Sequence, residues 1–241
     1  MRLLAGFCRS AVETIRFRRQ TVLRLIKGTG RAWGRGAAKR IPMRPVSALL
    51  ALPVAAILLG ACVPAETTSL STSGQMPPMQ WDVRPEGREW TVTTLSALEQ
   101  HDMALAAQVP ADVQAWCPGY AEASIEDRRA FWAGLMSAVA RYESTWNPQA
   151  SGGGGRYIGV MQISPVSADY HQCEADTVAE LKDGSDNLEC ATQMLAKAVA
   201  RDGLVAGGGN RGIGRDWMPL RSEGKRAAMA EWTRAQPYCQ G

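Results

Sequence analysis

The fold is decided by residues 124–165, which read SIEDRRAFWAGLMSAVARYESTWNPQASGGGGRYIGVMQISP. Ser124 stands three residues before Asp127, the spacing of a helix-capping box, and this predicts a helix over residues 124–144. Apolar residues then recur at helical spacing, at Trp132, Leu135, Met136 and Val139. The stretch therefore predicts a helix with one apolar face, followed by an irregular, glycine-rich segment.

Glu143 falls on the apolar stripe of this helix, seven residues after Met136 and four after Val139. Its carboxyl group therefore points toward the protein interior, where burial disfavours the charged form and raises the pKa. A carboxyl group with a raised pKa is what a general acid needs near neutral pH. Periodicity alone leaves a second interpretation open, in which Glu143 is a solvated residue at a helix end.

Two short motifs begin at Glu143. The first is Glu-Ser-Thr-Trp-Asn-Pro at residues 143–148, and the second is Gly-Val-Met-Gln-Ile-Ser-Pro at residues 159–165. Together with the Asp-Asn-Leu of residues 186–188, which opens another predicted helix, they resemble the soluble-lytic-transglycosylase-type family. The resemblance covers about residues 127–205 and implies an all-α (mainly helical), lysozyme-like single catalytic domain with a sugar-binding cleft.

The resemblance also implies a reaction on peptidoglycan strands. Glu143 protonates the oxygen between N-acetylmuramic acid and N-acetylglucosamine, then takes a proton from the muramic C6 hydroxyl, which closes on C1 as a 1,6-anhydro end. Ordinary glycosidases need two carboxylates, but the next acidic residue here, Asp169, has no motif around it. No cofactor is implied. The predicted substrate-binding residues are Ser144, Tyr157, Met161, Gln162 and Asn187.

Three of these residues have a second interpretation. Met161 could be a core residue. Ser144 could do no more than form a hydrogen bond at the helix end, and Asn187 could do no more than cap its helix. The glycines at 152–155 lack the Lys-Ser/Thr of a phosphate-binding loop, so we expect a flexible turn there. Further helices are expected near residues 94–107 and 223–236.

The chain departs from the family pattern after the last matched helix. The family carries Ala-Tyr-Asn-Ala-Gly there, whereas residues 204–210 read LVAGGGN. The family's Tyr is thought to position the acid, so either Trp217 or Tyr157 takes its place or the chemistry is weaker. Two alternatives to a lytic transglycosylase therefore stay open: a hydrolytic lysozyme on the same fold, and a catalytically inactive peptidoglycan-binding scaffold.

Residues 43–62 are typical of a lipoprotein signal peptide. A basic start at Met43 precedes 14 mainly apolar residues, 46–59, which is short of the roughly 20 that a membrane-spanning helix needs. The Leu-Gly-Ala-Cys of residues 59–62 looks like a lipobox. We therefore expect a signal peptide at 43–61, a lipid on Cys62, and a location on the periplasmic side of the outer membrane. The alternatives are an uncleaved anchor and a buried core segment.

The regions on either side of this signal complete the predicted organisation. Residues 1–42 carry 11 Lys and Arg against one Glu. Because a signal peptide normally begins a chain, we expect translation to start at Met43; the alternative is a basic, membrane-seeking N-terminal segment. Residues 62–80 are rich in Pro, Thr, Ser and Gly and predict a disordered tether. The catalytic domain is then expected at 81–241.

Charge argues against a nucleic-acid partner. From Cys62 onward, 15 basic residues face 22 acidic ones, a net charge of −7. An acidic domain repels phosphate backbones. We therefore expect no nucleic-acid binding, and a monomer whose partners are peptidoglycan and, through the lipid, a membrane.

The cysteine count agrees with export. Apart from Cys8 and Cys62, four cysteines remain, an even number for a compartment that permits disulfides. Of three connectivities we favour Cys173–Cys190, which closes a short loop, and Cys117–Cys239, which ties the ends of the domain together; buried free thiols are the alternative. His101 and His171 show no ligand spacing with these cysteines, so no metal site is expected.

Overall fold

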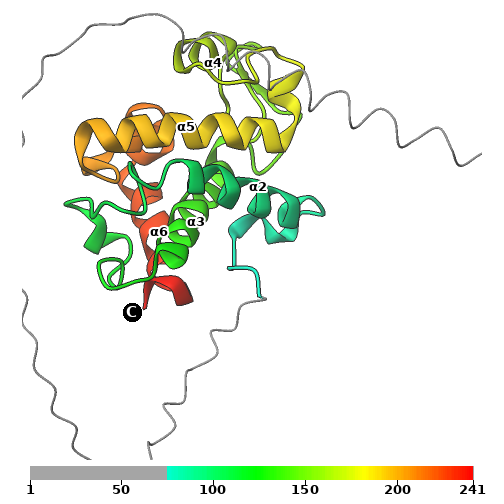
Figure 1. Cartoon of the computed structure of the whole chain (residues 1–241). Helices are drawn as coiled ribbons and strands as arrows, with labels where there is room; N and C mark the ends of the chain where they lie inside the picture. Colours follow the sequence, from blue (N-terminus) through cyan, green and yellow to red (C-terminus); the bar gives the residue numbers. More distant parts are fainter. Residues whose placement is uncertain (1–74, 241) are drawn as a thin grey trace, which may run out of the picture. The chain divides into compact units, whose positions relative to one another are not determined.

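Helix α3 (Ile125–Glu143) is the central element of the computed structural model, which describes residues 75–240. Every residue from Ala130 to Ala140 is buried, because helices α2 (Gly87–Gln100) and α6 (Glu223–Arg234) pack against it (Figure 1). At its start, the Ser124 hydroxyl accepts a hydrogen bond from the Asp127 N–H at 3.1 Å. The predicted N-cap is confirmed, and the helix is buried on more than one face.

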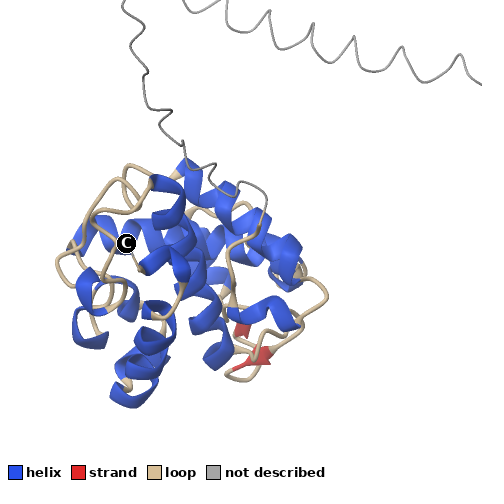
Figure 2. Cartoon of the chain, turned by 90° about the horizontal axis from the view of Figure 1, so that it is seen from below, coloured by secondary structure: helices blue, strands red, loops and turns tan. Residues whose placement is uncertain are grey.

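The remaining elements of the described residues are mostly short. One antiparallel hairpin joins β1 (Ser151–Gly152) to β2 (Tyr157–Ile158) and lies at one edge of the helical domain (Figure 2). The other helices are α4 (Pro165–His171), α5 (Gly184–Asp202), and the 3-10 helices η1 (Gln80–Val83), η2 (Val113–Ala115), η3 (Glu180–Lys182), η4 (Gly207–Gly209), η5 (Gly212–Arg215), η6 (Met218–Arg221) and η7 (Pro237–Cys239). The prediction of a mainly helical domain is confirmed.

Helix α2 begins and ends earlier than the predicted helix at 94–107. Its first residue, Gly87, lies so close to the Trp81 carbonyl that a Cβ atom there would come within 2.4 Å of the oxygen. The Trp81 indole N–H donates to the Thr91 hydroxyl at 2.8 Å, and its ring meets Trp90 edge-on. These are tertiary contacts between buried tryptophans, which helical periodicity does not register. Residues 101–107 form turns.

The folded domain also starts earlier than residue 81. Met79 is buried, the Gln80 N–H donates to the Ser137 hydroxyl at 3.0 Å, and the Pro78 carbonyl accepts from Tyr238 at 3.3 Å. Residues 78–80, predicted as tether, therefore pack on the domain. The predicted extension, signal peptide and lipidated Cys62 lie outside the described residues. Within residues 75–240, no helix has the length and apolar character needed to cross a membrane.

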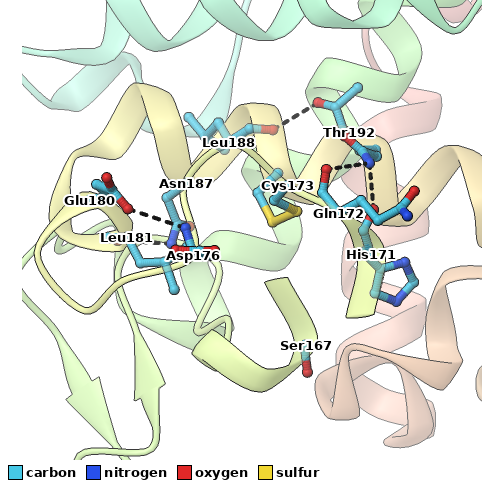
Figure 3. Close-up of a disulfide and its surroundings, with 12 residues drawn as sticks. Ser167, His171, Gln172, Cys173, Asp176, Glu180, Leu181, Asn187, Leu188 and Thr192 are labelled. Atoms are coloured by element: carbon cyan, nitrogen blue, oxygen red, sulfur yellow. Dashed lines mark hydrogen bonds between the residues drawn. A yellow bond between two sulfur atoms is a disulfide. The ribbon is translucent and has the colours of Figure 1, made fainter. Parts of the chain in front are cut away.

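Both favoured disulfides are present. Cys117–Cys239 joins residues 122 positions apart, and the same two segments share a hydrogen bond from the Gly119 N–H to the Cys239 carbonyl at 2.9 Å. Cys173–Cys190 joins the loop after α4 to the body of α5 (Figure 3). The first bridge closes the domain around α3, and the second fixes α4 against α5.

Candidate active site

Glu143 is the last residue of α3 and is half-buried. Burial raises the pKa of its carboxyl group to about 7, against a smaller lowering effect of the Lys225 ammonium. The predicted shielding of the carboxyl group is therefore confirmed, but the single apolar stripe is not, because α3 is buried on more than one face. At neutral pH this carboxyl group is protonated in a large fraction of molecules, as a general acid requires.

The chain turns sharply just after Glu143. Thr145 and Trp146 have φ angles of +54° and +56°, a left-handed conformation that residues with a Cβ atom seldom adopt. Two contacts hold this turn: the Trp146 indole N–H donates to the Ser137 carbonyl at 2.9 Å, and the Ser144 N–H donates to the Ala140 carbonyl at 3.0 Å. The end of α3 is thus fixed in place by its own helix.

Ser144 joins the two sequence motifs. Its hydroxyl donates to the Val160 carbonyl at 2.7 Å and accepts from the Asn147 N–H at 3.1 Å. Both functions of the hydroxyl are therefore used within the protein. The structure gives Ser144 a scaffold role beside Glu143, and its predicted contact with substrate stays a prediction.

Asn187 and Met161 lie in the core, with no side-chain surface exposed. Asn187 accepts from the Met161 N–H at 2.8 Å and donates to the carbonyls of Leu181 and Ile158 at 2.9 and 3.1 Å (Figure 3 shows Asn187 beside Leu181). Gly159 fits above it with φ +79°, where a Cβ atom would lie 2.1 Å from the Leu181 carbonyl oxygen. Neither Met161 nor Asn187 can touch substrate, so their predicted binding role is corrected to one of support.

Gln162 and Tyr157 lie at the hairpin. The Gln162 amide donates to the Gly159 carbonyl at 2.9 Å and, more weakly, to the Ala150 carbonyl at 3.4 Å. Tyr157 is 42% exposed on β2. The glycines at 153–155 all have positive φ and form the predicted turn between the strands. Of the five predicted binding residues, Tyr157 presents the most side-chain surface to a ligand.

Trp217 and Tyr157 differ sharply as replacements for the family's missing Tyr. Trp217 is buried, and its indole N–H donates to the Met161 carbonyl at 3.1 Å. Residues 160 and 161 are therefore held by Ser144, Asn187 and Trp217 together. Trp217 thus supports the segment that is tied to the helix end carrying Glu143, whereas Tyr157 stands on the exposed hairpin.

Sequence reasoning missed Lys225, the cation in α6 that acts on Glu143. Lys225 lies far along the chain in a helix without a motif, and only the packing of α6 on α3 brings it near. Among the described residues, no carboxylate is among the groups that shift the pKa of Glu143. The site therefore presents one carboxyl group and one ammonium group.

A cavity of about 390 Å³ among the described residues does not include Glu143 in its lining. Its lining from α2, α5 and the loop between α4 and α5 contains four carboxylates, at Glu174, Glu180, Asp186 and Glu189. Burial and mutual repulsion raise the pKa values of Asp186 and Glu189. We place the site at Glu143 because the residues bonded around it belong to the two motifs that begin there, whereas Asp186 of the third motif lines the cavity without either of them.

The buried carboxyl group predicts a stability cost. Because the pKa of Glu143 is raised from 4.5 to about 7, the unfolded chain loses this proton first, and the free energy of unfolding falls as pH rises through that window. Glu143→Gln removes the effect. We expect the variant to be more stable than wild type by about 2 kcal/mol at pH 8, after allowance for solvent screening, and by almost nothing at pH 4. Urea unfolding at both pH values measures this, and an equal difference at both would contradict the burial argument.

Comparison with known proteins finds one family model and several solved structures that match this chain. Residues 121–231 match the family model described as Transglycosylase SLT domain. The solved structure of Bd0314 DslA, wild-type form 2, superposes with a TM-score of 0.62, and a glutamate-to-glutamine mutant of that protein with 0.63. Each is 26% identical to this chain, covering 69% of it and 100% of the other chain. No curated protein sequence matches.

Proposed function

We propose that this chain, which belongs to the Transglycosylase SLT domain family through residues 121–231, is a peptidoglycan lytic transglycosylase. It cleaves the β-1,4 bond between N-acetylmuramic acid and N-acetylglucosamine and leaves a 1,6-anhydro end. One observation carries the proposal: Glu143, the first residue of the matched motifs, ends a buried helix with a pKa of about 7.

In the first step Glu143 is the acid. Its protonated carboxyl group gives a proton to the glycosidic oxygen as the bond from that oxygen to muramic C1 breaks. The N-acetyl group of the same sugar stabilises the positive charge that develops at C1. Burial of Glu143 favours this step, because burial disfavours the charged carboxylate and so raises the fraction of the neutral acid, which is the form that donates a proton.

In the second step the same group is the base. The Glu143 carboxylate takes the proton of the muramic C6 hydroxyl, and O6 forms a bond to C1. The leaving sugar keeps the first proton and Glu143 regains one, so the residue ends as it began and no water is consumed. A pKa near 7 suits a group that must give and take a proton in one turnover.

A single carboxyl group is sufficient for this sequence of steps. A hydrolase of the two-carboxylate kind holds its second group about 5–9.5 Å from the first, as nucleophile or as base for water. No carboxylate of the described residues is among the groups that shift the Glu143 pKa. This is compatible with internal closure by the C6 hydroxyl, and the products decide between closure and attack by water.

The test is mass analysis of the muropeptides that the purified chain releases from peptidoglycan. Anhydro ends, each lighter by one water than a reducing end, support the proposal. Reducing ends would instead establish a hydrolytic lysozyme. Binding to peptidoglycan without release of any product would establish a scaffold.

We also propose that the domain is lipid-anchored through Cys62 on the periplasmic side of the outer membrane. The apolar run at 46–59 and the lipobox at 59–62 support this placement. Mass analysis of the native N-terminus tests it, since a mature chain must then begin at Cys62 with acyl groups attached. A mature chain without acyl groups would contradict the anchor.

A further inference from the structure

Lys225 stands in the first turn of α6, the helix that packs against α3 and its terminal Glu143. Among the charged groups of the described residues, it is the one whose field acts on the Glu143 carboxyl group. The chain thus places a positive charge next to its catalytic acid from a distant part of the sequence. The two-step reaction described above gives this charge no part.

The Lys225 ammonium rests on an aromatic ring. Its Nζ atom lies 5.4 Å from the centre of the Tyr142 ring, and the guanidinium carbon of Arg141 lies 6.0 Å from the same centre. Tyr142 directly precedes Glu143 and is half-buried against the core. Attraction between an ammonium group and the ring face restricts the long lysine side chain, so its charge is held beside the acid.

Lys225 has no anionic partner within the described part of the chain. No carboxylate of residues 75–240 lies within 4.0 Å of its ammonium group, and none of their hydrogen bonds involves its side chain. Glu143 neutralises it only in part, because a carboxyl group with a pKa of about 7 is protonated in about half of the molecules at neutral pH. An exposed cation with three free donors therefore remains at the site.

We propose that Lys225, held on the Tyr142 ring, binds a carboxylate of the substrate's muramoyl side chain. The inference rests on the proposed function. Glu143 acts at C1 of the muramic acid ring, and the lactyl group stands on C3 of that ring, within reach of a lysine side chain next to Glu143. In peptide-free strands the lactyl group ends in a carboxylate, and in peptide-bearing strands the stem peptide carries carboxylates instead. Both sources offer the same chemistry.

The experiment measures the binding of soluble, uncross-linked glycan strands by the full chain carrying Glu143→Gln, which prevents turnover. Three ligands are compared: peptide-bearing strands, peptide-free strands, and peptide-free strands with the lactyl carboxylates converted to methylamides. Lys225→Met is introduced into this background, with Lys225→Arg as the conservative variant. Arg88→Met, which removes an exposed cation at the start of α2, is the matched control.

Lys225→Met is expected to raise Kd about three- to fivefold for a carboxylate-bearing ligand, the size of one exposed ion pair. Added salt should shrink this difference. If Lys225→Met weakens binding of peptide-free strands alone, the partner of Lys225 is the lactyl carboxylate. If it weakens binding of peptide-bearing strands alone, the partner is a carboxylate of the stem peptide. Lys225→Arg and Arg88→Met should bind as the parent does.

Equal weakening of the methylamide strands by Lys225→Met would overturn the inference, as would no change on either carboxylate-bearing ligand. Failure of the parent to bind any strand would also overturn it. The proposed function is judged separately, by the products of the chain that retains Glu143. If the protein binds strands through Lys225 but the chain with Glu143 releases no products, the proposed activity is refuted and the proposed binding role of Lys225 stands.

Discussion

Glu143→Gln is expected to lower the rate of glycan-strand cleavage by about 10³- to 10⁴-fold, the upper range for loss of a general acid and base. The amide keeps the size of the side chain but can neither donate a proton to the glycosidic oxygen nor accept one from the C6 hydroxyl. Timed release of muropeptides measures the rate. Asp169→Asn, which changes the next acidic residue of the chain and lies on the exposed side of α4, is the matched control and should keep the wild-type rate.

The pH dependence of kcat/KM should report the same group. The free enzyme needs Glu143 protonated, so activity is expected to be level below the pKa and to fall as pH rises through about 7. Lys225→Met removes a charge that lowers this pKa, so the falling limb should move to higher pH. A fall in activity near pH 7 that persists in Glu143→Gln would show that another residue is the acid. A Glu143→Gln protein with a rate within tenfold of wild type would show the same.

Replacing Cys117 and Cys239 together by Ala is expected to lower the free energy of unfolding by about 4–5 kcal/mol. The bridge joins residues 122 positions apart, so its loss frees a loop that contains most of the domain, including α3. The Cys173–Cys190 bridge closes a separation of 17, and its removal should cost about 3 kcal/mol.

The two disulfide variants are each other's control, and urea unfolding of both gives the comparison. Loss of the short-range bridge could lower the free energy of unfolding more than loss of the long-range bridge does. That result would contradict the argument from loop entropy. The long-range variant should also be the more sensitive to protease, because without the bridge only noncovalent contacts, such as the Gly119 to Cys239 hydrogen bond, hold the C-terminal segment to the segment around residue 117.

The sequence predicts well those features that depend on local chemistry. The Ser124 cap follows from residue spacing along one helix, and the same spacing, together with the motifs that begin at Glu143, favours a carboxyl group with a raised pKa. The disulfide pairing follows from a small number of cysteines and from a preference for one short and one long loop. Helical periodicity predicts helices but not how they are arranged. The family resemblance adds the lysozyme-like arrangement.

What the sequence does not predict depends on contacts between distant segments. A motif says that Met161 and Asn187 matter but not whether they touch ligand, and in the structure they bond each other inside the core. The early start of α2 depends on tryptophan packing at Trp81, and Lys225 reaches Glu143 only because α6 folds back on α3. Such roles become visible only when burial and partners are known.

The most direct test of the central claim is cleavage of peptidoglycan in water enriched in oxygen-18, followed by mass analysis of the new muramic acid ends. If O6 closes on C1 under control of Glu143, the ends are 1,6-anhydro and carry no heavy oxygen, and they disappear with Glu143→Gln. Reducing ends that contain oxygen-18 would contradict this account, because water would then be the nucleophile and a second group would have to activate it.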